Sequence, residues 1–96
     1  MLKAYVLTFN SEICPRQKVL ELLDTIPAVK NWYAYLPSSI FIISDQTAHV
    51  LANALLAKVN GSYYFVSEVP SGVNNGWLPE AAWQFINNPK SSGRWP

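Results

Sequence analysis

Two side chains in the sequence, a cysteine and a histidine, could form the nucleophile and base of a covalent catalyst. Cys14 stands just before Pro15, where a helix is expected to begin, and the free N–H groups of a helix start favour a reactive thiolate. A nucleophilic cysteine also needs a base, and His49 is the only histidine. The ordinary alternative is a small, half-buried Cys14 and a solvent-facing His49. We favour this second interpretation, so we expect no Cys–His pair.

Aromatic side chains form a second group of candidate functional residues. They are Tyr5, Phe9, Trp32, Tyr33, Tyr35, Phe41, Tyr63, Tyr64 and Phe65 on expected strands, with Trp77 and Trp83 further along the chain. Alternation along a strand directs some of them away from the side that helices cover. RNA-recognition sheets stack such rings on bases but are flanked by Lys and Arg, whereas these strands contain only Lys3. We therefore interpret the aromatic residues as interface residues, in a sheet-to-sheet dimer or beneath a C-terminal helix.

The composition narrows the classes of function. The 96 residues are 50% hydrophobic and 14% charged, which is typical of one globular domain and excludes a disordered chain. The net charge of +1 provides no strong attraction to nucleic acid or anionic lipid. Cys14 is the only cysteine, so an internal disulfide is impossible. We expect no cofactor, because there is no glycine-rich phosphate loop and no histidine pair. The single cysteine favours a cytoplasmic location, and residues 1–9 lack the long apolar run of a signal peptide or membrane span, so we expect no membrane contact.

Hydrophobic periodicity predicts an alternating series of strands and helices. Strands are expected at 3–9, 32–36, 39–44 and 62–69, and helices at 15–26 and 45–60. Pro37 and Ser38 suit a tight hairpin turn between the second and third strands. Asp45 is the expected N-cap of the second helix, Asn60 and Gly61 its C-terminal stop.

This order predicts an α+β fold of the ferredoxin-like βαββαβ kind. Two right-handed crossovers would place both helices on one face of a four-stranded antiparallel sheet and leave the other face bare. An additional C-terminal helix is expected at 78–88, docked with the help of Trp77 and Leu78. Whether it covers its own sheet or a neighbour's is left open. We expect a single domain over 1–88 and a flexible tail over 89–96.

The segments AYVLTFN, KVLELL, YLPSSIFIIS and YYFVSEV resemble the small ferredoxin-fold proteins around the bacterial CRISPR-adaptation endonuclease family and its VapD-like relatives. The resemblance covers about residues 3–69. It implies a homodimer built by packing bare sheet faces and, in active members, an acidic residue after the first strand that helps bind a catalytic metal. The matching position here is Asn10, whose amide is a poor metal ligand and cannot act as a general base. Glu12 is the nearby substitute.

Three functions follow from these observations. The first is a non-catalytic homodimer that acts by interaction with another macromolecule, a protein or a nucleic acid. The second is a metal-dependent nuclease or nucleic-acid-processing protein that uses Glu12. The third is a small-ligand-binding module with a pocket near Trp77 and Trp83. The absence of an acidic residue at Asn10 inclines us towards the first and away from an enzyme.

Overall fold

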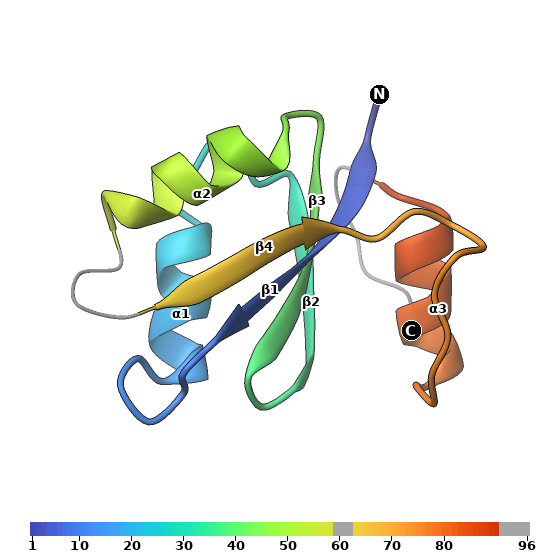
Figure 1. The fold of residues 1–96 in the computed structure, drawn as a ribbon, viewed down its shortest axis with the longest axis horizontal. Helices are drawn as coiled ribbons and strands as arrows, with labels where there is room; N and C mark the ends of the chain where they lie inside the picture. Colours follow the sequence, from blue (N-terminus) through green and yellow to red (C-terminus); the bar gives the residue numbers. More distant parts are fainter. Residues whose placement is uncertain (59–62, 91–96) are drawn as a thin grey trace.

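The computed structural model describes residues 1–58 and 63–90 and shows the predicted α+β architecture (Figure 1). Its elements are β1 (Lys3–Phe9), α1 (Arg16–Leu23), β2 (Asn31–Leu36), β3 (Ser39–Ser44), α2 (Ala48–Leu56), β4 (Tyr64–Glu68) and α3 (Glu80–Asn87). The four strands form one antiparallel sheet in the order β2-β3-β1-β4. This topology is compatible with a ferredoxin-like fold that carries an extra helix.

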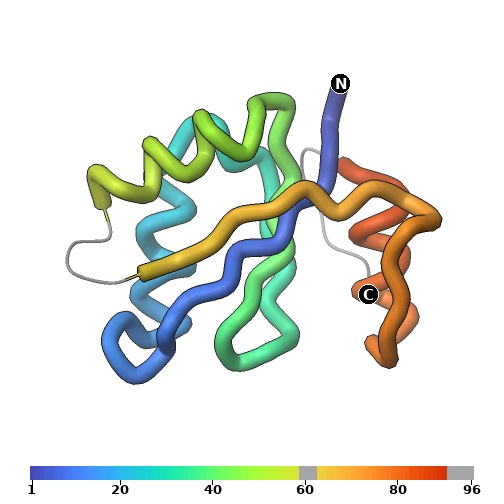
Figure 2. The backbone as a smooth tube through the Cα atoms, in the orientation of Figure 1, coloured from blue at the N-terminus to red at the C-terminus, as the bar shows by residue number. Residues whose placement is uncertain are grey.

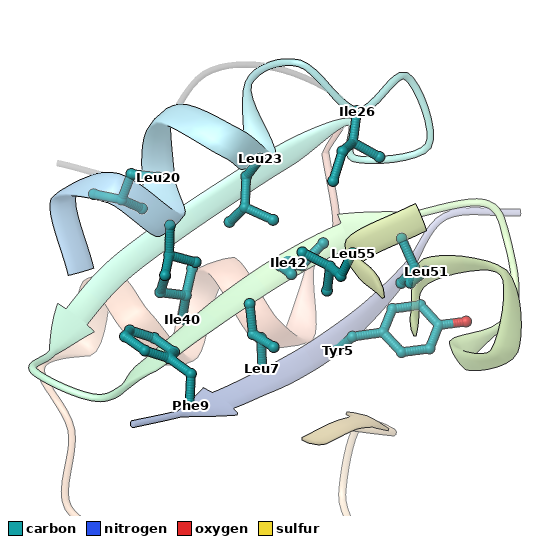
Figure 3. Close-up of a cluster of buried hydrophobic side chains, with 11 residues drawn as sticks. Tyr5, Leu7, Phe9, Leu20, Leu23, Ile26, Ile40, Ile42, Leu51 and Leu55 are labelled. Atoms are coloured by element: carbon teal, nitrogen blue, oxygen red, sulfur yellow. The ribbon is translucent and has the colours of Figure 1, made fainter. Parts of the chain in front are cut away.

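The first hydrophobic core lies between the sheet and the helices α1 and α2 (Figure 3). Strand alternation directs every second side chain of β1 and β3 to this side. The strands contribute Tyr5, Leu7, Phe9, Ile40 and Ile42, and the helical side contributes Val19, Leu20, Leu23, Ile26, Leu51 and Leu55. All are buried. The spacing of the helical residues at three and four positions therefore gives each helix one apolar face against the sheet.

A second core lies on the opposite face of the sheet, beneath α3 (Figure 1). Ala4, Phe41 and Ile43 of the sheet meet Ala82, Phe85 and Ile86 of the helix, and all six are buried. The ring centroids of Tyr33 and Phe85 are 5.6 Å apart. The expectation that this face of the sheet is bare is therefore wrong for the part that α3 covers. The helix covers its own sheet because its three apolar residues match the outward residues of β1 and β3.

Several local details differ from the sequence-based expectation. The N-cap of α2 is Thr47, not Asp45, because the Thr47 hydroxyl accepts a hydrogen bond from the Val50 N–H at 3.2 Å. Helix α1 ends at Leu23 and the chain turns before Pro27. Trp77 does not help to dock α3, since its side chain is 99% exposed. The expected stop at Asn60 and Gly61 and the tail residues 91–96 lie outside the described residues.

The predicted hairpin and the loop after β1 meet at one end of the sheet. Leu36 pairs with Ser39, so Pro37 and Ser38 form the turn as expected. Figure 2 shows this turn and the loop between β1 and α1 on the same side of the molecule. The hydroxyl oxygens of Ser11 and Ser38 are 3.1 Å apart and link the two segments.

Candidate functional site

The structure places Cys14 and His49 beyond opposite ends of β1. Ser44, which pairs with Lys3, leads into α2, and His49 stands in the first turn of that helix. Cys14 follows the other end of β1, beyond Phe9. A strand rises about 3.3 Å per residue, so β1 separates its two ends by about 20 Å. The fold therefore does not assemble a Cys–His pair.

Each of these two residues has an ordinary structural environment. Cys14 is half-buried against the first core, and its backbone N–H donates to the Asn10 carbonyl at 2.9 Å. His49 is exposed, and its Nε2 lies 3.1 Å from the side-chain nitrogen of Asn53, one turn further along α2. Within residues 1–58 and 63–90, no three His, Cys, Asp or Glu side chains are grouped to hold a metal ion.

Asn10 shapes the loop in which the resemblance would place a catalytic acid. Its side-chain oxygen accepts a hydrogen bond from the backbone N–H of Glu12 at 3.0 Å, and this contact closes a local turn. The Glu12 side chain is exposed. An asparagine at this position thus holds the loop in shape, and Glu12 is presented at its surface.

This loop forms one wall of an open groove of about 620 Å³ at the end of the sheet. The lining residues are Thr8, Phe9, Asn10, Ser11, Glu12, Ser38, Tyr63, Tyr64 and Phe65. Thr8 pairs with Phe65 across β1 and β4, which brings the ring of Phe65 next to the loop after β1. Glu12 is the one charged residue among the described lining residues. The groove therefore combines aromatic rings, neutral hydrogen-bonding groups and a single carboxylate, without the paired carboxylates of a two-metal nuclease site.

The structure divides the predicted interface residues into three groups. Tyr5 and Phe9 are buried in the first core, beneath α1 and α2, so their assignment to a dimer interface or to the C-terminal helix is wrong. Phe41 is buried beneath α3, which is one of the two placements expected for it. Trp32, Tyr33, Tyr64 and Trp83 are half-buried, and the Trp32 indole N–H donates to the Asp24 carboxylate at 2.7 Å. Tyr35, Tyr63, Phe65 and Trp77 are exposed. Only this last group lies fully on the surface.

A second hollow, of about 350 Å³, lies at the start of α3. Tyr35, Trp77, Leu78 and Pro79 line it. Trp83 is not among the described residues that line this hollow, and it packs against the second core. Phe41 and Phe85 fill the centre of the contact between the sheet and α3. A third hollow, of about 280 Å³, lies beside the end of α3, and Ala4, Val69 and Ile86 are among its lining residues.

Strand β4 forms an edge of the sheet, and its outer backbone groups can be assigned. The Val69 N–H donates to the Ala4 carbonyl at 2.8 Å, so residue 69 bonds towards β1. Backbone groups alternate sides along an antiparallel ladder, and the β1–β4 register continues from this pair without a shift. Ser67 and Phe65 therefore bond towards β1. The backbone N–H groups of Tyr64, Val66 and Glu68 point away from the sheet.

Two tyrosine hydroxyls donate hydrogen bonds to backbone carbonyls on the helix-covered side of the sheet. The Tyr5 hydroxyl donates to the Gln46 carbonyl and the Tyr64 hydroxyl to the Ala52 carbonyl, each at 2.5 Å. Burial raises the pKa of both phenols above the ordinary value of 10.0, and the negative charge of Glu68 raises that of Tyr5 further. Both side chains are therefore neutral donors at physiological pH.

Sequence reasoning identified Glu12 and the aromatic residues separately but did not join them. The missing signal was the register between β1 and β4, which sets Phe65 opposite Thr8 and brings Tyr63 and Phe65 beside the Glu12 loop. Thr8 and Phe65 are far apart in the sequence. The residues around each of them do not specify which residue of β4 pairs with which residue of β1.

No helix within the described part of the chain has the length and apolar character needed to cross a bilayer. No protein-family model, curated protein or solved structure matches this chain.

Proposed function

We propose that the protein is a non-catalytic homodimer that acts by binding another macromolecule, and that the two copies join through β4. The observation that carries this proposal is the outward direction of the Tyr64, Val66 and Glu68 N–H groups on an edge strand. An exposed edge is a template for pairing with another strand unless a bulge, a proline or covering chain blocks it. β4 contains neither a proline nor a lysine, and its register with β1 is regular.

The other edge, β2, carries the features that discourage strand pairing. Its register with β3 shifts between Tyr33 and Leu36, and Pro37 follows directly. The Asn31 side chain also donates to the Lys90 carbonyl at 3.3 Å, so chain beyond α3 lies against the start of β2. The contrast between the two edges supports β4 as the interface.

A two-fold axis at Val66 gives β4 a self-complementary partner. Antiparallel pairing then sets Val66 opposite Val66 of the second copy and Tyr64 opposite Glu68. Phe65 of one copy then faces the small side chain of Ser67 in the other copy, and no two like charges are paired across the edge. Apolar residues flank the edge on both sides of the sheet, since Phe65 is 64% exposed on one face and Leu56 of the adjacent α2 is 67% exposed. The dimer would remove the part of this surface that borders the edge from water, while the side of the Phe65 ring that faces away from the sheet stays open.

Size-exclusion chromatography with light scattering on the full chain is the direct test, with a dimer as the expected result. Val66→Pro is the sharp variant, because it removes an N–H that points outward and spares the bonds to β1. We expect a folded monomer. Val66→Ala is the matched control, since it also trims the side chain but keeps the N–H, and it should remain a dimer. A monomeric wild type, or a Val66→Pro variant that is folded and still dimeric, would contradict the proposal.

A further inference from the structure

We propose that the groove beside β4 binds an arginine side chain of a partner protein. This inference rests on the proposed function in that it names the kind of macromolecule that the dimer would recognise. The groove holds the three features that a guanidinium group needs: an aromatic face, a carboxylate and neutral hydrogen-bond acceptors. They are supplied by Phe65, Glu12 and the hydroxyl groups of the loop and hairpin turn.

The carboxylate of Glu12 is available to a ligand. Within the described residues it has neither a hydrogen-bond partner nor an ion-pair partner, although the backbone of Glu12 is held by Asn10. The turn that Asn10 closes thus fixes where Glu12 leaves the backbone without using its charge. An unpaired negative charge on a fixed turn is a suitable partner for a cation.

The aromatic wall is equally accessible. Phe65 pairs with Thr8 on the part of the sheet that α3 does not cover, and its ring is 64% exposed. A cation is attracted to the face of such a ring by its quadrupole, and a planar guanidinium can also stack on it. Tyr63 also lines the groove.

Neutral oxygens complete the site. Thr8, Ser11 and Ser38 line the groove, and the hydroxyls of Ser11 and Ser38 lie 3.1 Å apart. A guanidinium carries its N–H donors in a fixed planar fork, so it can reach a carboxylate and a hydroxyl at the same time. A lysine ammonium is a compact point charge without this planar shape, and we therefore favour arginine.

The same charge pattern argues against a nucleic-acid ligand. The described lining contains no Lys or Arg, and Glu12 would repel a phosphate. Phosphate neutralisation by basic side chains provides most of the affinity in nucleic-acid complexes. Aromatic rings without these charges are a poor platform for a polyanion, whereas they suit a cationic side chain.

The test uses nuclear magnetic resonance titration of the full chain with acetyl-Gly-Arg-Gly-amide. The matched peptide carries citrulline, which keeps the planar shape and loses the charge. We expect the arginine peptide to shift the backbone amide signals of Asn10, Glu12 and Phe65 in a saturable way. The citrulline peptide should bind more weakly. Equal binding of the two peptides, or shifts confined to other surfaces, would overturn the proposal.

Variants of the groove give the second arm of the test. Glu12→Gln should weaken binding of the arginine peptide by about two- to fivefold, the range for one exposed ion pair. Glu21→Gln removes the same charge from the exposed surface of α1, outside the groove, and should leave binding unchanged. If Glu12→Gln and Glu21→Gln bind the arginine peptide with the same affinity as each other, the peptide is attracted only by the net charge of the protein and the site is disproved.

The titration is repeated on Val66→Pro, so that the two proposals can fail separately. The groove lies within one protomer, and we expect the monomeric variant to bind the arginine peptide as wild type does. Binding by a protein that is monomeric without any substitution would reject the dimer and retain the groove. A dimer whose groove ignores the peptide would reject only the arginine site.

Discussion

The phenolic oxygen of Tyr64 lies 2.5 Å from the backbone carbonyl oxygen of Ala52 and donates a hydrogen bond to it. This contact joins the edge strand β4 to α2, its neighbour on the helix-covered face. Tyr64 and Phe65 point to opposite faces of the sheet, so the bond also determines which face presents Phe65 to the groove. Anchoring of β4 through Tyr64 on one face and exposure of Phe65 on the other are thus parts of the same arrangement.

Replacement of Tyr64 with Phe removes this bond while preserving the ring. We expect the free energy of unfolding to fall by about 0.5–1.5 kcal/mol, the usual net value of one hydrogen bond. Urea unfolding followed by circular dichroism gives the value. Tyr35→Phe is the control, since Tyr35 is exposed and the same atom is removed from it. If both variants lose the same free energy of unfolding, the hydrogen bond of Tyr64 contributes nothing to stability.

Alkaline pH should destabilise the fold through Tyr5 and Tyr64. The folded state raises the pKa of both phenols, so above pH about 10 the unfolded chain loses these protons first. Their contribution to stability is fully present below that pH and is lost as the pH rises through the raised pKa values. Urea midpoints measured between pH about 8 and 11 should decline. The decline should be smaller in a Tyr5→Phe, Tyr64→Phe double variant, and an identical decline would contradict the assignment.

Phe85 is the residue through which α3 is most firmly attached. Its side chain is 2% exposed and packs within the second core, against Tyr33. Phe85→Ala should lower the free energy of unfolding by about 3–5 kcal/mol because of lost burial and the cavity left behind. Asn87→Ala, at an exposed position of the same helix, should change it by less than about 0.5 kcal/mol. Denaturant unfolding of both variants makes the comparison, and a small effect of Phe85→Ala would refute tight docking of α3.

Ser67→Pro is the counterpart of the edge variant Val66→Pro. Ser67 lies one residue further along β4, and its N–H bonds towards the Val6 carbonyl of β1. Proline at this position removes the bond and leaves that carbonyl unsatisfied, at a cost of about 1–3 kcal/mol. Thermal unfolding should show a clear loss for Ser67→Pro and a smaller one for Val66→Pro. The reverse order would show that the assignment of inward and outward N–H groups is wrong.

Much of the fold follows from short-range patterns in the sequence. Alternation in KAYVLTF and spacing at three and four in RQKVLELL specify which side of each element is apolar, because burial requires one continuous apolar face. Pro37 and Ser38 mark the hairpin, and the order of elements then restricts the topology to the ferredoxin-like pattern. These features depend on neighbours in the chain and can be inferred without coordinates.

Local patterns cannot distinguish between competing partners for the same group. Asp45 and Thr47 are both suitable N-caps, and the position of the Val50 N–H decides in favour of Thr47. The apolar stripe of α3 predicts that it packs somewhere, but only the tertiary structure shows that it covers Phe41 on its own sheet. That choice buries Phe41 against α3 and removes it from a sheet-to-sheet dimer.

The sequence by itself determined the secondary structure, the apolar faces and the topology of the sheet. The tertiary structure decided which aromatic residues remain exposed and which residues form the groove. The physical reason is that exposure and convergence depend on the offset between distant segments, such as the pairing of Thr8 with Phe65. This offset results from the packing of the whole sheet against three helices, and no short segment encodes it.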